Sequence, residues 1–90
     1  MELRKSFTVS HPNGINVDQC AQLTEVVREY KNTECVMAYN SRYADIKSFL
    51  NVTSLGLKHK DIFTIICKGV SSNEALLNIE QTLQSLKIVN

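Results

Sequence analysis

Apolar and polar side chains alternate at the start of the chain. One side of this stretch carries Leu3, Lys5, Phe7 and Val9. A period of two residues predicts a β-strand over residues 2–10, with Lys5 as the only polar member of its inner side. The "HPNG" that follows ends the strand, because Pro12 fixes φ and the Asn13-Gly14 pair favours a turn.

From Asn16 onward the apolar spacing changes to three and four residues, which predicts a helix. The expected apolar face comprises Val17, Cys20, Leu23, Val27 and Tyr30. Asn16 is a favoured N-cap, and Gln19, three residues later, completes a capping-box pattern. Asp18 lies in the first turn, where the positive end of the helix dipole favours a carboxylate.

The middle of the chain predicts a hairpin and then a short helix. "CVMAY" (35–39) and "RYADI" (42–46) are strand-like. Asn40-Ser41 between them suits a tight turn, because Asn tolerates positive φ. Ser48 is a candidate N-cap for a short helix that Gly56 ends. The apolar positions of that helix are Phe49, Leu50, Val52 and Leu55.

The last third predicts a buried strand and an amphipathic helix. "DIFTIIC" (61–67) is rich in β-branched and aromatic residues, and Gly69 ends it. Ser71 and Glu74 form a second capping-box pattern at the start of a helix that runs to about Leu86. Its apolar positions are Leu76, Ile79, Leu83 and Leu86.

The expected element order is therefore β-α-β-β-α-β-α. The hairpin lies among helices that must cover an apolar sheet face, so we predict an α+β sandwich. It has four mostly antiparallel strands and all three helices on one side. Ninety residues suit a single domain over residues 1–90, and no stretch resembles a linker or a repeat.

Composition and charge narrow the classes of function. The formal net charge is +1, so no broad field attracts nucleic acid or an anionic membrane. No apolar stretch approaches the roughly 18–20 residues of a membrane span, and no signal peptide is visible. Three widely spaced cysteines make neither a disulfide framework nor a metal-binding pattern, which suits a reducing cytoplasm. We expect no metal and no cofactor.

Three segments carry a family resemblance. They are "SFTVSHPNGINVDQCAQL" (6–23), "KSFLNVTSLG" (47–56) and "IFTIICKGVSSNEALL" (62–77). They resemble the blocks of the histidine-containing phosphocarrier (HPr) family of the bacterial sugar phosphotransferase system. Those blocks are a strand with Gly-Leu/Ile-His-Ala-Arg-Pro-Ala, then Lys-Ser-Ile-Met-Gly-Leu-Met-Ser-Leu-Gly, then strand, glycine, acidic loop and Glu-Ala-Leu. The resemblance spans nearly the whole chain and implies the open-faced β-sandwich of that family.

The phosphoryl-transfer residues of the family are replaced in this sequence. The resemblance places the phosphorylated histidine at Asn16 and its helper arginine at Asp18, with Gln19 and Cys20 at the proline and alanine positions. An amide has no nucleophilic nitrogen of useful basicity, and a carboxylate repels a phosphate dianion instead of pairing with it. The resemblance therefore implies a divergent HPr-like protein that has lost the phosphocarrier site.

Other groups that could accept a phosphoryl group have simpler interpretations. His11 lies in the turn before the first helix and His59 lies in a polar loop, so both suit solvent-facing positions. Cys20 shares the apolar stripe of the first helix, and Cys35 and Cys67 lie in strand-like runs, where cysteine packs as a small hydrophobe.

Ser48 matches a serine that an ATP-dependent kinase phosphorylates in Gram-positive members of the HPr family, after which the protein binds a transcriptional repressor. Lys47, Phe49 and Leu50 keep the surrounding pattern, whereas Asn51 and Thr53 replace a glycine and a methionine of the family's partner surface. A phosphate at a helix N-cap meets free N–H groups and the positive end of the dipole. Plain capping by Ser48 stays open as the alternative.

We predict a non-enzymatic regulatory or protein-binding domain, with an HPr kinase or a transcriptional regulator as the partner. The expected partner surface comprises Asn16, Asp18, Lys47, Ser48, Phe49, Leu50 and Val52. Two alternatives remain: a working phosphocarrier that uses an atypical acceptor such as His11, and a fold recruited as a structural module.

Overall fold

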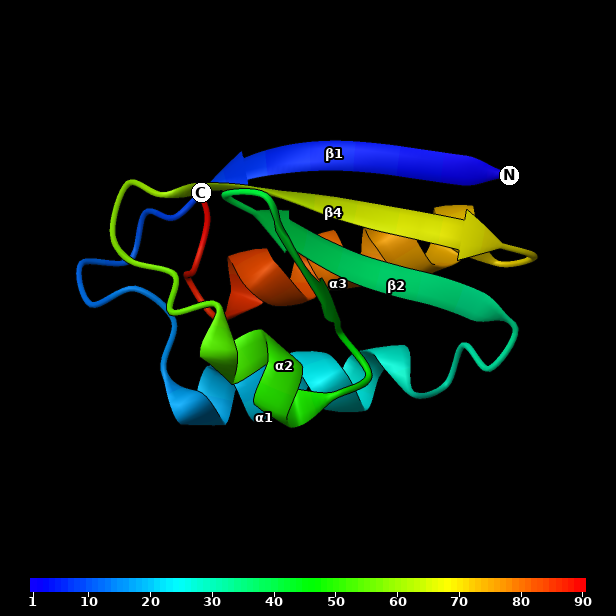
Figure 1. The fold of residues 1–90 in the computed structure, drawn as a ribbon, viewed down its shortest axis with the longest axis horizontal. Coiled ribbons are helices and arrows are strands. Elements are labelled where there is room, and N and C mark those ends of the chain that lie inside the picture. The colour runs from blue at the N-terminus through cyan, green and yellow to red at the C-terminus, as the bar shows by residue number, and fades with distance from the viewer.

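The computed structural model describes all residues from Met1 to Asn90. Its elements follow the order β-α-β-β-α-β-α (Figure 1). Their bounds are β1 Glu2–Thr8, α1 Val17–Val27, β2 Thr33–Tyr39, β3 Arg42–Asp45, α2 Phe49–Ser54, β4 Ile62–Gly69 and α3 Ser72–Ser85. None of these helices has the length and apolar character to cross a membrane.

The four strands form one sheet in the order β1-β4-β2-β3, and every neighbouring pair is antiparallel. All three helices lie on the same side of this sheet (Figure 1). The predicted fold class and element order are thus confirmed. The chain reaches this strand order because the two crossovers through helices bring β4 between β1 and β2.

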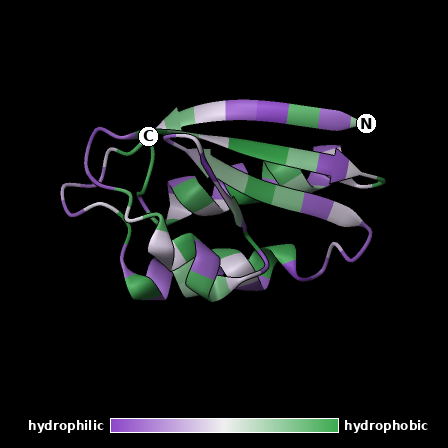
Figure 2. Ribbon diagram, in the orientation of Figure 1, coloured by the Kyte–Doolittle hydropathy of each residue, from purple (hydrophilic) through white to green (hydrophobic).

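The core fills the space between the sheet and the helices. Apolar residues concentrate on the central strands β4 and β2 (Figure 2), and 21 buried hydrophobic residues from the whole chain form one cluster. Phe7 and Phe63 stack across β1 and β4 with ring centroids 5.7 Å apart. Lys5, the polar exception of β1, faces the helix layer as predicted, and its ammonium pairs with the Glu80 carboxylate of α3 at 2.6 Å.

Local turn chemistry explains the ends of most elements. Asn40 and Ser41 both have positive φ, at 52° and 66°, which is the geometry of a two-residue hairpin turn between β2 and β3. Gly56 follows α2 with φ at 62°, as expected for a helix stop. The hairpin and the two stops at Gly56 and Gly69 agree with the sequence prediction.

Two local predictions were wrong. Val17 is 61% exposed instead of joining the apolar face of α1. It is the first residue of the helix, and its side chain leans toward the N-terminus, where no earlier turn lies beneath it. Ser71 caps α3 without a side-chain hydrogen bond, so the capping box with Glu74 does not form. Its ψ of 32° departs from the extended backbone that a side-chain cap requires.

Candidate functional site

The loop before α1 is fixed to the rest of the protein by its backbone. The N–H of Ser10 donates to the carbonyl of Ile88 at 2.8 Å, and the N–H of Ile15 donates to the carbonyl of Leu57 at 3.3 Å. Gly14 has φ at 71°, and a Cβ built there would lie 2.4 Å from the Leu57 carbonyl oxygen. A glycine is therefore needed for both its backbone angle and its close approach.

The predicted capping box at the start of α1 is present. The side-chain oxygen Oδ1 of Asn16 accepts the Gln19 N–H at 2.8 Å, and Oε1 of Gln19 accepts the Asn16 N–H at 3.0 Å. The Gln19 amide also donates to the Leu86 carbonyl at 3.3 Å, which ties α1 to the end of α3. Asn16 and Asp18 are exposed at this helix entrance. The entrance thus offers an amide and a carboxylate to solvent, and no basic nitrogen.

Neither histidine lies on α1. His11 is half-buried in the turn, where its Nδ1 accepts the Asn13 N–H at 3.1 Å. This bond leaves only Nε2 of the ring free. His59 is exposed in the loop before β4, as expected from its polar surroundings.

The segment that leads into α2 is anchored by Lys47. Its ammonium donates to the carbonyls of Tyr30 and Thr33 at 2.6 and 2.8 Å. We predicted from the sequence that Lys47 belongs to the partner surface, but these two hydrogen bonds hold its ammonium against the protein's own backbone. Ser48 is the N-cap of α2, as predicted, and its hydroxyl accepts the Asn51 N–H at 3.4 Å. Because that distance is long for a hydrogen bond, the capping interaction of the Ser48 hydroxyl is weak.

The apolar residues of α2 divide between core and surface. Leu50 is 74% exposed and Phe49 is half-buried, so both remain members of the predicted surface. Val52 is only 3% exposed and belongs to the core. The sequence placed Val52 on the partner surface, but its burial in the core leaves its side chain almost no exposed area with which to contact a partner.

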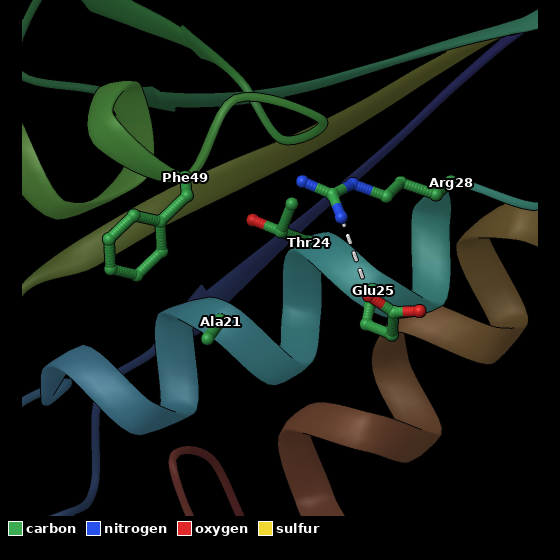
Figure 3. A pocket seen from close by; sticks show the side chains of 5 residues that line it. All are labelled: Ala21, Thr24, Glu25, Arg28 and Phe49. Carbon is green, nitrogen blue, oxygen red and sulfur yellow. Dashed lines mark hydrogen bonds and ion pairs between the residues drawn. The ribbon is translucent and has the colours of Figure 1, made fainter.

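A groove of about 320 Å³ lies between α1 and α2. Its lining residues are Ala21, Thr24, Glu25 and Arg28 of α1 and Phe49 of α2 (Figure 3). The Thr24 residue is 2% exposed, and its hydroxyl has no hydrogen-bond partner. In Figure 3 this hydroxyl lies on the side of α1 that faces Phe49, and the Glu25–Arg28 ion pair, 3.5 Å long, stands at the rim.

The sequence prediction missed the α1 side of this groove. Its four positions recur at three and four residues, so they share one face of the helix next to the buried stripe. That spacing was visible in the sequence, but only the packing of α2 beside α1 turns the face into a groove. No group of three or more His, Cys, Asp or Glu side chains is placed to hold a metal ion.

Comparisons with known proteins agree with this architecture. The family described as "PTS HPr component phosphorylation site" matches residues 3–85. The phosphocarrier protein HPr of Mycoplasma genitalium is 30% identical over 81 residues, which cover 90% of this chain and 92% of that protein.

Two solved structures share the fold. A mycoplasma histidine-containing phosphocarrier protein superposes with a TM-score of 0.94 at 18% identity, covering 98% of this chain and 99% of the other. The Bacillus subtilis catabolite repression protein Crh gives a TM-score of 0.73 at 17% identity, covering 91% of this chain and 92% of the other.

Proposed function

The chain belongs to the HPr family of the bacterial phosphotransferase system, and from that premise we propose that it is a protein-binding, regulatory member that carries no phosphoryl group. The capping box of α1 is the observation behind this proposal. At the helix entrance, Asn16 uses its side-chain oxygen to hold the Gln19 N–H. An amide nitrogen lacks the basic lone pair of a neutral imidazole. Asp18 adds a negative charge where an incoming phosphate would need a cation.

A phosphotransfer assay tests the loss of carrier activity. The protein is incubated with phosphoenolpyruvate and Enzyme I, with Mycoplasma genitalium HPr as the active control, and its mass is measured under non-acidic conditions. We expect no acid-labile gain of about 80 Da, the mass of one phosphoryl group. The double variant Asn16→His/Asp18→Arg restores the family's residues and should gain the adduct.

A phosphorylated wild-type protein in the same assay would contradict the proposal. Loss of that adduct in His11→Ala would then identify His11 as an atypical acceptor through its free Nε2. Transfer of the phosphoryl group onward to a sugar-specific component would establish a working phosphocarrier.

We further propose that partners bind across α1 and α2. Leu50 offers an exposed apolar anchor beside the groove that Phe49 and Thr24 line. The groove lies next to Leu50, so an apolar side chain of a partner could pack against Phe49 while its backbone follows the rim at Glu25 and Arg28. The occupant that fits is a protein segment with an apolar side chain that packs against Leu50, presented by an HPr kinase or a transcriptional regulator.

Two exposed aliphatic residues give a matched test of this surface. Leu50→Asp changes the proposed anchor, whereas Val70→Asp makes the same change at an exposed site after β4. We expect Leu50→Asp to weaken calorimetrically measured binding of the HPr kinase by about tenfold or more. Val70→Asp should leave the affinity unchanged. Equal effects of the two substitutions, or none from Leu50→Asp, would instead favour a fold recruited as a structural module.

Ser48 is the proposed point of regulation on this surface. Its hydroxyl accepts only a 3.4 Å bond, and a phosphate there would face the N–H groups of the first turn of α2. We expect the HPr kinase and ATP to add one phosphoryl group to the wild type and none to Ser48→Ala. An unmodified wild type, with a known substrate phosphorylated in parallel, would leave Ser48 with its capping role alone.

A further inference from the structure

Two of the three cysteines face each other across the centre of the sheet. Cys35 of β2 lies directly opposite Cys67 of β4, and these are the two inner strands. Residues opposite each other in an antiparallel pair point to the same face, and both side chains are fully buried in the core between sheet and helices. The fold therefore brings together two thiols that lie far apart in the sequence.

Backbone hydrogen bonds show which kind of pair this is. The carbonyl of Cys35 accepts the Ile46 N–H at 2.9 Å, on the β3 side of β2. The Gly69 N–H donates to the Met1 carbonyl at 3.0 Å, on the β1 side of β4. Cys67 lies two residues earlier in the same strand, so its backbone N–H and carbonyl also point toward β1 and away from β2. Cys35 and Cys67 thus form a non-hydrogen-bonded pair.

That pairing places the two sulfurs within reach of a covalent bond. The Cα atoms of non-hydrogen-bonded pairs are typically about 4.5 Å apart. Disulfides span Cα separations of about 4.4–6.8 Å. No other pair of cysteines faces across neighbouring strands, because Cys20 lies on α1.

The two thiols also differ in acidity, and the difference indicates which sulfur reacts first. A hydrogen bond from the Cys67 thiol lowers the pKa of Cys35, against the opposing effect of burial, and the nearby Lys47 ammonium lowers it further. The same hydrogen bond and burial raise the pKa of Cys67. Cys35 is therefore the sulfur that ionises first, and thiolates are the form that reacts with oxidants.

We propose that Cys35 and Cys67 are a modification site at which a peroxide closes an intramolecular disulfide in the folded protein. The Cys35 thiolate attacks hydrogen peroxide, so that a sulfur–oxygen bond forms and the oxygen–oxygen bond breaks, giving a sulfenic acid and hydroxide. The Cys67 sulfur then displaces the hydroxyl group, and its proton leaves with that group as water. Two thiols are oxidised by two electrons, and one peroxide is reduced to two waters.

An oxidant can reach this buried pair only when the structure opens locally. Cys35 is the third residue of β2 and Cys67 is the third from the end of β4, so both lie close to the loops that join these strands to their helices. Strand ends and adjoining loops open more readily than the middle of a sheet. A water-sized oxidant needs only such a local opening. This site is separate from the α1–α2 surface, and the inference stands without the proposed function.

The three cysteines supply an internal control for the experiment. The wild-type protein is treated with hydrogen peroxide in buffer, where it is folded, and in parallel in concentrated urea, where it is unfolded. The remaining thiols are then alkylated, and disulfide-linked peptides are identified by mass spectrometry. In the unfolded chain the shortest loop, between Cys20 and Cys35, should close most readily. In the folded protein we expect the Cys35–Cys67 linkage to exceed all Cys20-containing linkages by about tenfold or more.

Variants and reversal complete the test. Cys20→Ala should keep the linkage, and dithiothreitol should remove it. Cys67→Ala should leave Cys35 as a sulfenic acid that a dimedone probe captures. The proposal is overturned if the folded wild type gives mainly Cys20-containing linkages, dimers through a disulfide, or no linkage while the unfolded chain is oxidised. The comparison of folded and unfolded wild type decides the matter even if a variant fails to fold.

Discussion

Replacing Asn16 by alanine tests whether this residue now serves the fold. The substitution removes one bond, the 2.8 Å contact between Oδ1 of Asn16 and the Gln19 N–H. The reciprocal bond from the Asn16 N–H to Gln19 survives, because it uses only the backbone of residue 16. The link from the Gln19 side chain to Leu86 also survives. The variant therefore loses half of the capping box and little else.

The size of the effect follows from that count. Loss of a side-chain N-cap destabilises a protein by about 1 kcal/mol. For a domain of this size, 1 kcal/mol lowers the melting temperature by about 4–8 °C. Asn16→Ser supplies the control, because a serine hydroxyl can accept the same N–H and should restore most of the lost stability.

Thermal unfolding followed by circular dichroism measures all three proteins. A melting temperature of Asn16→Ala equal to that of the wild type would refute the structural role of this side chain. If Asn16→Ser melted as low as Asn16→Ala, the amide would have a role other than accepting the Gln19 N–H.

Three further substitutions test the loop, the groove and the core. Gly14→Ala should lower the free energy of unfolding in urea by more than Gly56→Ala does. Both glycines have positive φ, but a Cβ at residue 14 would lie 2.4 Å from the Leu57 carbonyl oxygen, whereas a Cβ at residue 56 would meet nothing within 4 Å. Equal losses of stability would exclude the clash at residue 14. Thr24→Val should raise that free energy by about 1 kcal/mol, because it removes a buried, unpaired hydroxyl. A loss of stability would mean that the hydroxyl is satisfied. Burial raises the pKa of the Cys20 thiol above its usual 9.0, so the thiol loses its proton at lower pH in the unfolded chain than in the folded protein. The contribution of Cys20 to stability should therefore be full below pH about 9 and fall above it. Cys20→Ala should flatten that part of a pH series of urea titrations, and an unchanged slope would contradict the assignment.

The local parts of the candidate site were predictable from the sequence. Three such features each depend on residues no more than four positions apart. They are the capping box of Asn16 and Gln19, the N-cap at Ser48 and the helix stop at Gly56. Such features follow from side-chain reach and from the few backbone angles that each residue type allows. The side-chain cap at Ser71 did not form, because the ψ of 32° at this residue departs from the extended backbone that such a cap requires.

The composition of the proposed partner surface was less predictable. Val52 and Leu50 are two residues apart on a six-residue helix and look equally apolar in the sequence, yet one is buried and the other exposed. Lys47 looked like a surface charge, but its ammonium is held by two backbone carbonyls. Burial and pairing of this kind depend on where α2 packs against α1 and the sheet, which no local pattern contains.

The sequence by itself determined the element order, the turns and the main helix caps, including the cap at Asn16. These are consequences of hydrophobic period and backbone stereochemistry, which act over a few residues. The tertiary structure decided the groove at Thr24, the burial of Val52 and the pairing of Cys35 with Cys67. The physical reason is the same in each case: contacts between elements distant in the chain depend on strand order and register, and these are set by the packing of the whole core at once.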